Sequence, residues 1–164
     1  MIDMDSIARR ARELHQGAFL PALLVRLYLG YFFFETGIGK VQNLDVMAER
    51  FSEWGIPFPG WSAALSGYTE HIGGALLFLG LATRAVCLPL FINMVVAVLS
   101  VKLAAVASLS EFVELDEPLY ALSFLWLFFQ GPGPVSFDHL LRCIMQLPPA
   151  MRAREEHRAA SARL

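Results

Sequence analysis

The residues with the clearest chemical potential are Glu70 and His71, near the centre of the apolar segment 61–84. An ionisable group in hydrocarbon is costly, so it persists beside a partner or a wet cavity, and it often marks function. A carboxylate in such a place could pair with a cation, carry a proton or bind the head group of a quinone. Three glycines flank the pair and allow a neighbouring helix to approach closely. We therefore expect this segment to lie inside a helical bundle.

The composition is typical of an integral membrane protein with one domain. Of the 164 residues, 56% are hydrophobic and only 17% are charged, which is far more apolar than an average soluble domain. No basic patch is interleaved with aromatic residues, so nucleic-acid binding has no support. The first twenty residues carry three acidic side chains and no cleavage site follows, so they are not read as a cleavable signal.

Hydropathy and periodicity predict an all-α integral membrane protein, an antiparallel four-transmembrane-helix bundle with interfacial amphipathic helices. The fourth apolar run is short, about 18 Å against a hydrocarbon core of ~30 Å, so it must recruit flanking residues. The predicted parts are an amphipathic helix at 4–16 within a cytoplasmic segment 1–18, then a membrane domain 19–147 with spans at about 19–40, 61–81, 85–108 and 117–133, an outer interfacial helix at 44–54 and an inner one at 136–147, and a polar basic tail 148–164.

The topology follows from the distribution of basic residues. Arginines cluster near the N-terminus, in the turn between the second and third spans at Arg84, and near the C-terminus, whereas the other two connections are acidic. Basic loops stay on the cytoplasmic side, so both termini are predicted to be cytoplasmic. The outer helix 44–54 then lies over the mouth of the bundle, where it is either a lid or, as we favour, an amphipathic spacer.

The polar groups inside the spans are predicted to form two seams. Their depths, taken from the helical rise, and their angles around each helix place Arg26, Asn93, Glu70 and His71 in one seam. Glu35 and Lys102 form a second pair nearer the outside. An Arg26–Glu70 pair would be either a structural ion pair that fixes helix register, which we favour, or a polar site for a quinone head group or a proton.

Two further polar residues of the spans are Lys40 and His71. The first span carries a stripe of residues at helical spacing, which we interpret as an inter-helix face. Lys40 stands at the end of this stripe, and its side chain is expected to snorkel to the outer interface. His71 is read mainly as a packing residue, and a Glu–His metal site lacks a third ligand, so no metal is expected. No flavin or nicotinamide fingerprint, haem-ligand pair or redox dithiol is present in the sequence. The stripe consists of Arg26, Gly30, Phe33, Gly37 and Lys40.

An ordered series of short motifs, from about residue 20 to 141, resembles the DoxX family of small bacterial four-helix membrane proteins. One departure is Pro134-Val135, where the family more often has a basic and then an aromatic residue. The motifs are Arg26-Leu-Tyr-Leu-Gly30, Gly37-Ile-Gly-Lys40, Gly55-Ile-Pro-Phe-Pro59, Glu70-His-Ile-Gly-Gly74, Gly80-Leu-Ala-Thr-Arg84, and Gly131-Pro-Gly followed by Ser136-Phe-Asp138.

The resemblance implies a multi-pass protein of the bacterial cytoplasmic (inner) membrane. The family is named after a subunit of a membrane thiosulfate:quinone oxidoreductase, and related proteins assist the maturation of redox enzymes. Carried over by motif, the first positions of interest are Arg26, Lys40, Glu70, Arg84 and Asp138. Asp138 stands at the start of the last helix, where its expected role is capping and complementing the helix dipole.

We therefore expect an accessory or quinone-interacting subunit of a membrane redox system. A quinone is the one cofactor that we consider. The protein would be at most a non-catalytic or quinone-binding subunit, because a lone enzyme would need a cofactor motif that the sequence lacks. Its expected partners are the lipid bilayer, a redox-enzyme subunit or further copies of itself. The alternatives are a small proton-coupled transporter that uses Glu70, and a membrane anchor or assembly factor that recruits a partner through helix 44–54 or the tail.

Overall fold

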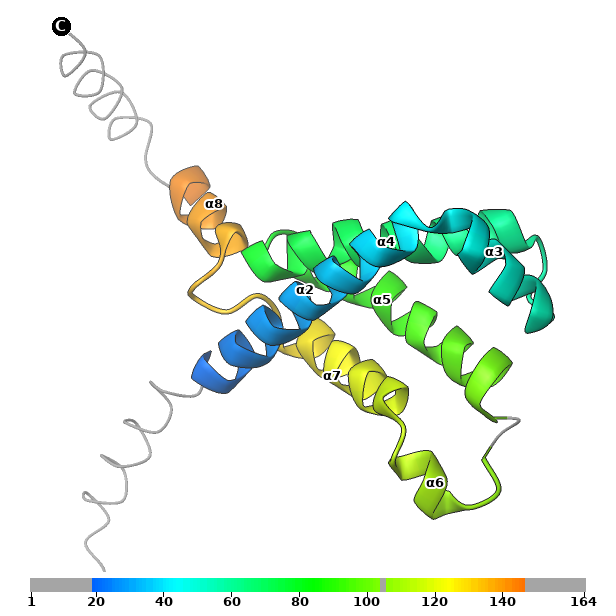
Figure 1. Ribbon diagram of the computed structural model, residues 1–164. Helices are drawn as coiled ribbons and strands as arrows, with labels where there is room; N and C mark the ends of the chain where they lie inside the picture. The colour runs from blue at the N-terminus through cyan, green and yellow to red at the C-terminus, as the bar shows by residue number, and fades with distance from the viewer. Residues whose placement is uncertain (1–18, 104–105, 147–164) are drawn as a thin grey trace, which may run out of the picture.

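The computed structural model describes residues 19–103 and 106–146, and all regular elements within these ranges are helical (Figure 1). The predicted all-helical class is therefore confirmed. The predicted helix at 4–16 and the tail 148–164 lie outside the described residues. The elements are α2 (Phe19–Gln42), α3 (Leu44–Glu53), α4 (Pro59–Leu79), α5 (Thr83–Ala97), the π-helix η1 (Val98–Lys102), α6 (Leu109–Val113), α7 (Asp116–Gln130) and α8 (Phe137–Gln146).

Helices α2 and α4 pack against each other with their backbones in close approach. A Cβ atom added to Gly37 would overlap the backbone of His71, and one added to Gly74 would overlap that of Phe34. A Cβ on Gly30 would lie 2.5 Å from the backbone nitrogen of Phe78. These contacts set an antiparallel register in which residue 30 lies beside 78 and residue 37 beside 71. Small residues at the crossing are what permit it.

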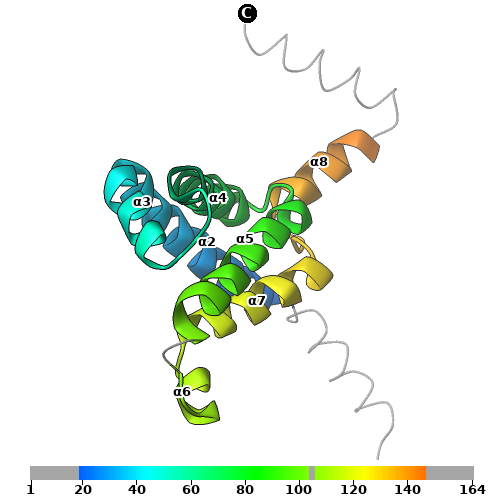
Figure 2. The same cartoon turned by 90° about the vertical axis from the view of Figure 1, so that its right-hand side faces the viewer.

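The apolar core lies where α2, α4, α5 and α7 meet. Leu77, Leu90, Phe124 and Leu127 are all 0% exposed, although they come from three different helices. The ring of Phe33 on α2 contacts that of Phe124 in an edge-on arrangement, with centroids 5.0 Å apart. Figure 2 shows α3 beside α4 on one side of the molecule and α7 beside α5 on the other. The core thus joins two helix pairs.

Helix α5 diverges from α4 as it runs toward the end of the molecule that carries α3 (Figure 1). Pro89 lies inside α5, where it removes one backbone hydrogen bond and favours a kink. The helix continues without a break into η1, whose wider turn is a second departure from regular α-helix. The divergence leaves space between α4 and the second half of α5.

Helix α3 crosses the end of this space after a short connection from α2. Its Phe51 is buried, and a tight turn returns the chain to α4 through Gly55 (φ 70°) and Phe58 (φ 50°). At the opposite end of the molecule Ser136 caps α8, since its Oγ accepts a hydrogen bond from the backbone nitrogen of His139 at 3.1 Å. The two ends of the bundle are therefore built from different elements.

Among the described residues, two helices are long and apolar enough to cross a membrane: Phe19–Gln42 and the continuous helix Thr83–Lys102. The helix Thr83–Lys102 corresponds to the predicted third span, and it ends at residue 102 rather than near 108. The acidic connection that follows it is not only a loop, because it contains α6 (Leu109–Val113). Ser108 starts that helix by accepting a hydrogen bond from the backbone nitrogen of Glu111 at 3.3 Å. Helix α4 is 21 residues long and α7 is 15.

Candidate functional site

Glu70 is 1% exposed, in the middle of α4, and three side chains satisfy its carboxylate. Lys40 Nζ lies 2.5 Å from Oε1, and Asn93 Nδ2 donates a hydrogen bond to the same oxygen at 2.7 Å. Thr36 Oγ1 donates to Oε2 at 3.3 Å. We call these four residues the Glu70 site. A buried carboxylate is tolerated only when it is paired and hydrogen-bonded in this way.

Three helices position the Glu70 site. Thr36 and Lys40 stand one turn apart on α2, so both reach the same face. Gly37 lies between them and lets α4 approach closely enough for Glu70 to lie within hydrogen-bond distance. Asn93 comes from α5, one turn after Pro89. The structure thus brings together three of the predicted site residues: Glu70, Asn93 and the motif residue Lys40.

The prediction that Arg26 pairs with Glu70 is wrong. Arg26 is buried, but Nη1 donates to the carbonyl oxygen of Pro132 at 2.5 Å and Nη2 to that of Val135 at 2.8 Å. The antiparallel register explains the error, because it places Arg26 beside Gly80, near the far end of α4. Lys40, which was expected to reach the outer interface, takes the position beside Glu70 instead.

Asp138 ties the same end of the molecule together. Its Oδ1 accepts a hydrogen bond from the backbone nitrogen of Ala82 at 2.8 Å, and its Oδ2 accepts from that of Thr83 at 3.2 Å. Asp138 lies at the start of α8, but its carboxylate caps the start of α5. A negative charge is favourable at the N-terminus of a helix. Arg84 Nη2 is 3.5 Å from the carbonyl oxygen of Phe129 nearby. We call this region, built around Arg26 and Asp138, the Arg26–Asp138 corner.

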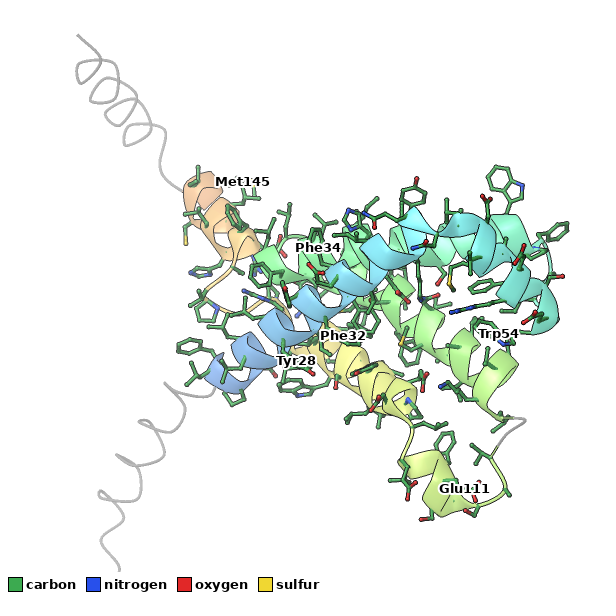
Figure 3. The ribbon with its side chains drawn as sticks, in the orientation of Figure 1. Tyr28, Phe32, Phe34, Trp54, Glu111 and Met145 are labelled. Atoms are coloured by element: carbon green, nitrogen blue, oxygen red, sulfur yellow. The ribbon has the colours of Figure 1, made fainter. Side chains whose placement is uncertain are left out.

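His71 does not join the Glu70 site. Its ring stacks on that of Phe34 with centroids 4.7 Å apart, and its Nδ1 is 3.4 Å from the carbonyl oxygen of Phe34. Figure 3 shows Phe34 on the side of α2 away from Phe32, which contacts Tyr120 of α7. His71 is thus a packing residue between α2 and α4.

The predicted Glu35–Lys102 pair is also wrong. Lys102 Nζ lies 3.1 Å from Oε1 of Glu117, at the start of α7. Glu35 is exposed on the outer face of α2. The cause is the divergence of α5, which carries Lys102 away from α2 and toward α7.

A cavity of about 650 Å³ opens beside the Glu70 site, in the space between α4 and the second half of α5. Its floor carries Lys40, Glu70 and Asn93, and α3 covers one edge with Phe51 and Trp54. Figure 3 shows Trp54 between α3 and α5. The rest of its wall is largely apolar, with side chains such as Phe32, Leu65, Ile92 and Val96.

The two side chains of the ion pair both line this cavity but are unequally exposed. The side chain of Lys40 is 28% exposed, whereas that of Glu70 is 2% exposed. An ammonium group has three hydrogen-bond donors, so Lys40 can bind Glu70 and still donate to a ligand oxygen. An apolar cavity with a few convergent polar groups is the usual form of a small-molecule site. This arrangement suits an apolar ring that carries a carbonyl oxygen.

Sequence reasoning missed Thr36 and the two α3 aromatics as members of this region, and it singled out Lys40 from the family motif without placing it beside Glu70. The signal for Lys40 was present, because the predicted inter-helix stripe of α2 includes it. The assignment failed because a lysine near a helix end normally reaches the interface. Trp54 and Phe51 could be placed only once the path of α3 was known.

Comparison with known proteins identifies the family. The DoxX family model matches residues 22–103. An uncharacterized membrane protein of Mycobacterium tuberculosis is 32% identical over 142 residues, which cover 79% of this chain and 86% of that protein. The CatD protein of Bacillus subtilis, whose name describes it as a candidate oxidoreductase, is 36% identical over 86 residues, covering 52% of this chain and 63% of CatD. No solved structure matches the chain. The chain is a membrane protein of the DoxX family.

Proposed function

We propose that this DoxX protein is an accessory or quinone-interacting subunit of a membrane redox system, and that the Glu70 site holds the quinone head group. One observation carries the proposal: a largely apolar cavity of about 650 Å³ is lined by both members of an ion pair, Lys40 and Glu70, of which the lysine is the more exposed. The oxidoreductase name of the Bacillus subtilis relative supports a redox setting.

The proposed membrane arrangement has four spans, formed by α2, α4, the continuous helix Thr83–Lys102 and α7. Both termini and α8 would face the cytoplasm, and α3 and α6 the outer side of the bacterial cytoplasmic membrane. The length of α4, 21 residues, supports a span because it corresponds to about 32 Å of helix. Helix α7 is shorter, so its flanking residues must lie in the interface or the bilayer must thin locally.

Within the site, each side chain has a distinct role. Lys40 donates a hydrogen bond to a ligand oxygen and stabilises negative charge that develops there. Glu70 and Thr36 hold Lys40 in place, and Glu70 is the group that can exchange a proton with the ligand oxygen through it. Asn93 fixes the carboxylate from the other side. The electrons come from a partner protein, because the proposal gives this chain no redox group of its own.

The test is purification in mild detergent or native nanodiscs, followed by mass spectrometry of the bound small molecules. We expect a stoichiometric quinone with the wild-type chain and little or none with Glu70→Gln. Glu35→Gln is the matched control, because the same change falls on the exposed face of α2 and should leave the quinone bound.

Two other outcomes would replace the proposal. Proton-coupled flux in proteoliposomes that Glu70→Gln abolishes would indicate a small transporter. A protein partner that is retained by Glu70→Gln but lost when residues 44–54 are scrambled would indicate an anchor or assembly factor. In both cases the absence of a bound quinone from wild type would count against the proposed site.

A further inference from the structure

We infer that the cavity at the Glu70 site is closed toward the Arg26–Asp138 corner, so that water-soluble ligands reach it only from the α3 half of the molecule, and that it admits uncharged or cationic ligands rather than anions. The inference deepens the proposed function, because it concerns access to the same cavity. It would give the site one-sided exchange of water-soluble ligands and protons. Under the proposed topology that side is the outer face of the membrane.

The first observation is where the cavity wall comes from. The lining residues of α2 begin at Phe32, and those of α4 end at Glu70. Those of the continuous helix Thr83–Lys102 begin at Pro89. Because α2 and α4 are antiparallel and the chain then turns back into α5, these segments all lie at the end that carries α3 (Figure 1). The cavity therefore occupies one half of the bundle.

The second observation is a packed layer below the floor. Four side chains of this layer are at most 3% exposed: Leu29 of α2, Leu77 of α4, and Cys87 and Leu90 of α5. Gly30 of α2 closes the layer, because it lies against the backbone of Phe78 on α4. They stand between the cavity and the Arg26–Asp138 corner. Protein interiors at this packing leave no passage wider than a water molecule.

A smaller cavity at the corner does not breach this layer. Its volume is about 260 Å³, and its wall includes Arg26, Phe78 and Phe137. It shares no lining residue with the cavity at the Glu70 site. The two spaces are therefore separate, and they lie toward opposite ends of the molecule.

The third observation is the charge of the wall. Four charged side chains line the cavity, and three of them are carboxylates: Glu70 on the floor, and Asp116 and Glu117 near the mouth. Lys40 balances Glu70, and Lys102 balances Glu117 at 3.1 Å. Asp116 is left as the excess negative charge at the entrance. An excess negative charge at the entrance raises the local concentration of cations there and lowers that of anions.

The test is labelling of introduced cysteines in the full-length chain with membrane-impermeant thiol reagents. Thr69→Cys places the probe on the cavity wall beside Glu70. The native Cys87 is kept, because it is 0% exposed and belongs to the packed layer. The native Cys143 is exposed on α8 and marks the opposite face. Tyr68→Cys is the matched control, since Tyr68 is 47% exposed and does not line the cavity. Right-side-out and inverted membrane vesicles are compared.

We expect Thr69→Cys to react only from the face opposite to that of Cys143, and Tyr68→Cys to react from neither face because it would lie in lipid. A cationic reagent should react about tenfold faster at Thr69→Cys than an anionic one of the same size, after correction for their rates with a free thiol. Labelling from the face of Cys143, from both faces or from neither would overturn one-sided access. A faster anionic reagent would overturn the charge selection.

The experiment separates this inference from the proposed function. One-sided labelling of Thr69→Cys that a short-chain quinone does not slow would support the access route and contradict the quinone site. If Thr69→Cys does not fold, Ser66→Cys on the same wall provides the same readout.

Discussion

The Glu70 site and the Arg26–Asp138 corner lie toward opposite ends of α2, and each contains a buried charged side chain, but different partners satisfy them. Arg26 donates to backbone carbonyls, and Asp138 accepts from backbone nitrogens. Glu70 is held by side chains alone, and one of them, the partly exposed Lys40, lines a large cavity. Backbone partners fix a fold, because they cannot turn toward a ligand. Side-chain partners can exchange one hydrogen bond for another, so the Glu70 site is the region suited to binding.

The largest expected effect comes from leaving the Glu70 carboxylate unpaired. Lys40→Met should destabilise the protein by about 3–5 kcal/mol, since a buried charge loses its counter-ion. Glu70→Gln should cost much less, because Lys40 is partly exposed and can find water. Unfolding in a denaturing detergent series would measure both. The double variant Lys40→Met/Glu70→Gln should recover most of the loss, and a double variant as unstable as Lys40→Met would contradict the pairing.

A smaller loss of stability is expected at the corner. Arg26→Met removes two charged hydrogen bonds to carbonyl oxygens and should cost about 2–3 kcal/mol. Arg84→Met is the control at the same end, because Arg84 is exposed and its one contact is 3.5 Å long. The same unfolding assay applies. Loss of bound quinone in Arg26→Met at unchanged stability would contradict this account, because it would place ligand binding at the Arg26–Asp138 corner and not at the Glu70 site.

The helix contact between the two regions can be tested with glycine. Gly37→Ala should destabilise the protein by about 1–3 kcal/mol, because its Cβ would meet the backbone of His71. Gly39→Ala, two residues away, has open space around it and should stay within about 0.5 kcal/mol of wild type. Gly37 lies between Thr36 and Lys40, so Gly37→Ala should also weaken ligand binding. Equal effects of the two substitutions would show that the register of α2 on α4 is different.

The smallest effect is expected at the cover of the cavity. Trp54 lines the cavity from α3 and is 38% exposed, so Trp54→Ala should change stability little. It should weaken quinone binding by about tenfold, since stacked aromatic contacts contribute about 0.5–1.5 kcal/mol beyond the area they bury. Trp61→Ala is the control, because Trp61 is 83% exposed and does not line the cavity. A titration of purified protein with a short-chain quinone would compare them, and equal affinities would remove α3 from the site.

The sequence predicts the helical class and singles out Glu70 and Asn93, because apolar runs and intramembrane charges are local signals. It does not predict the partner of Glu70. Pairing depends on the register between α2 and α4, which is set by where Gly30, Gly37 and Gly74 meet the opposite backbone. Arg26 and Lys40 stand on the same stripe of α2, about four turns apart, so the sequence pattern alone does not decide which of them meets Glu70. It also does not predict the cavity, because the divergence of α5 beyond Pro89 is a property of tertiary packing. Asp138 shows the same limit, since its cap reaches a helix that starts 55 residues earlier.

The most direct test of the central claim is to locate a bound quinone by photolabelling. A photoreactive quinone analogue is cross-linked to the wild-type protein in nanodiscs, and the modified peptides are mapped by mass spectrometry. We predict labels on the cavity wall, around Thr36 to Lys40 of α2, Ser66 to Glu70 of α4 and Asn93 to Ala97 of α5, that excess unlabelled quinone removes. Labels that concentrate on α8 and the loop before it, beside Arg26, would contradict the account.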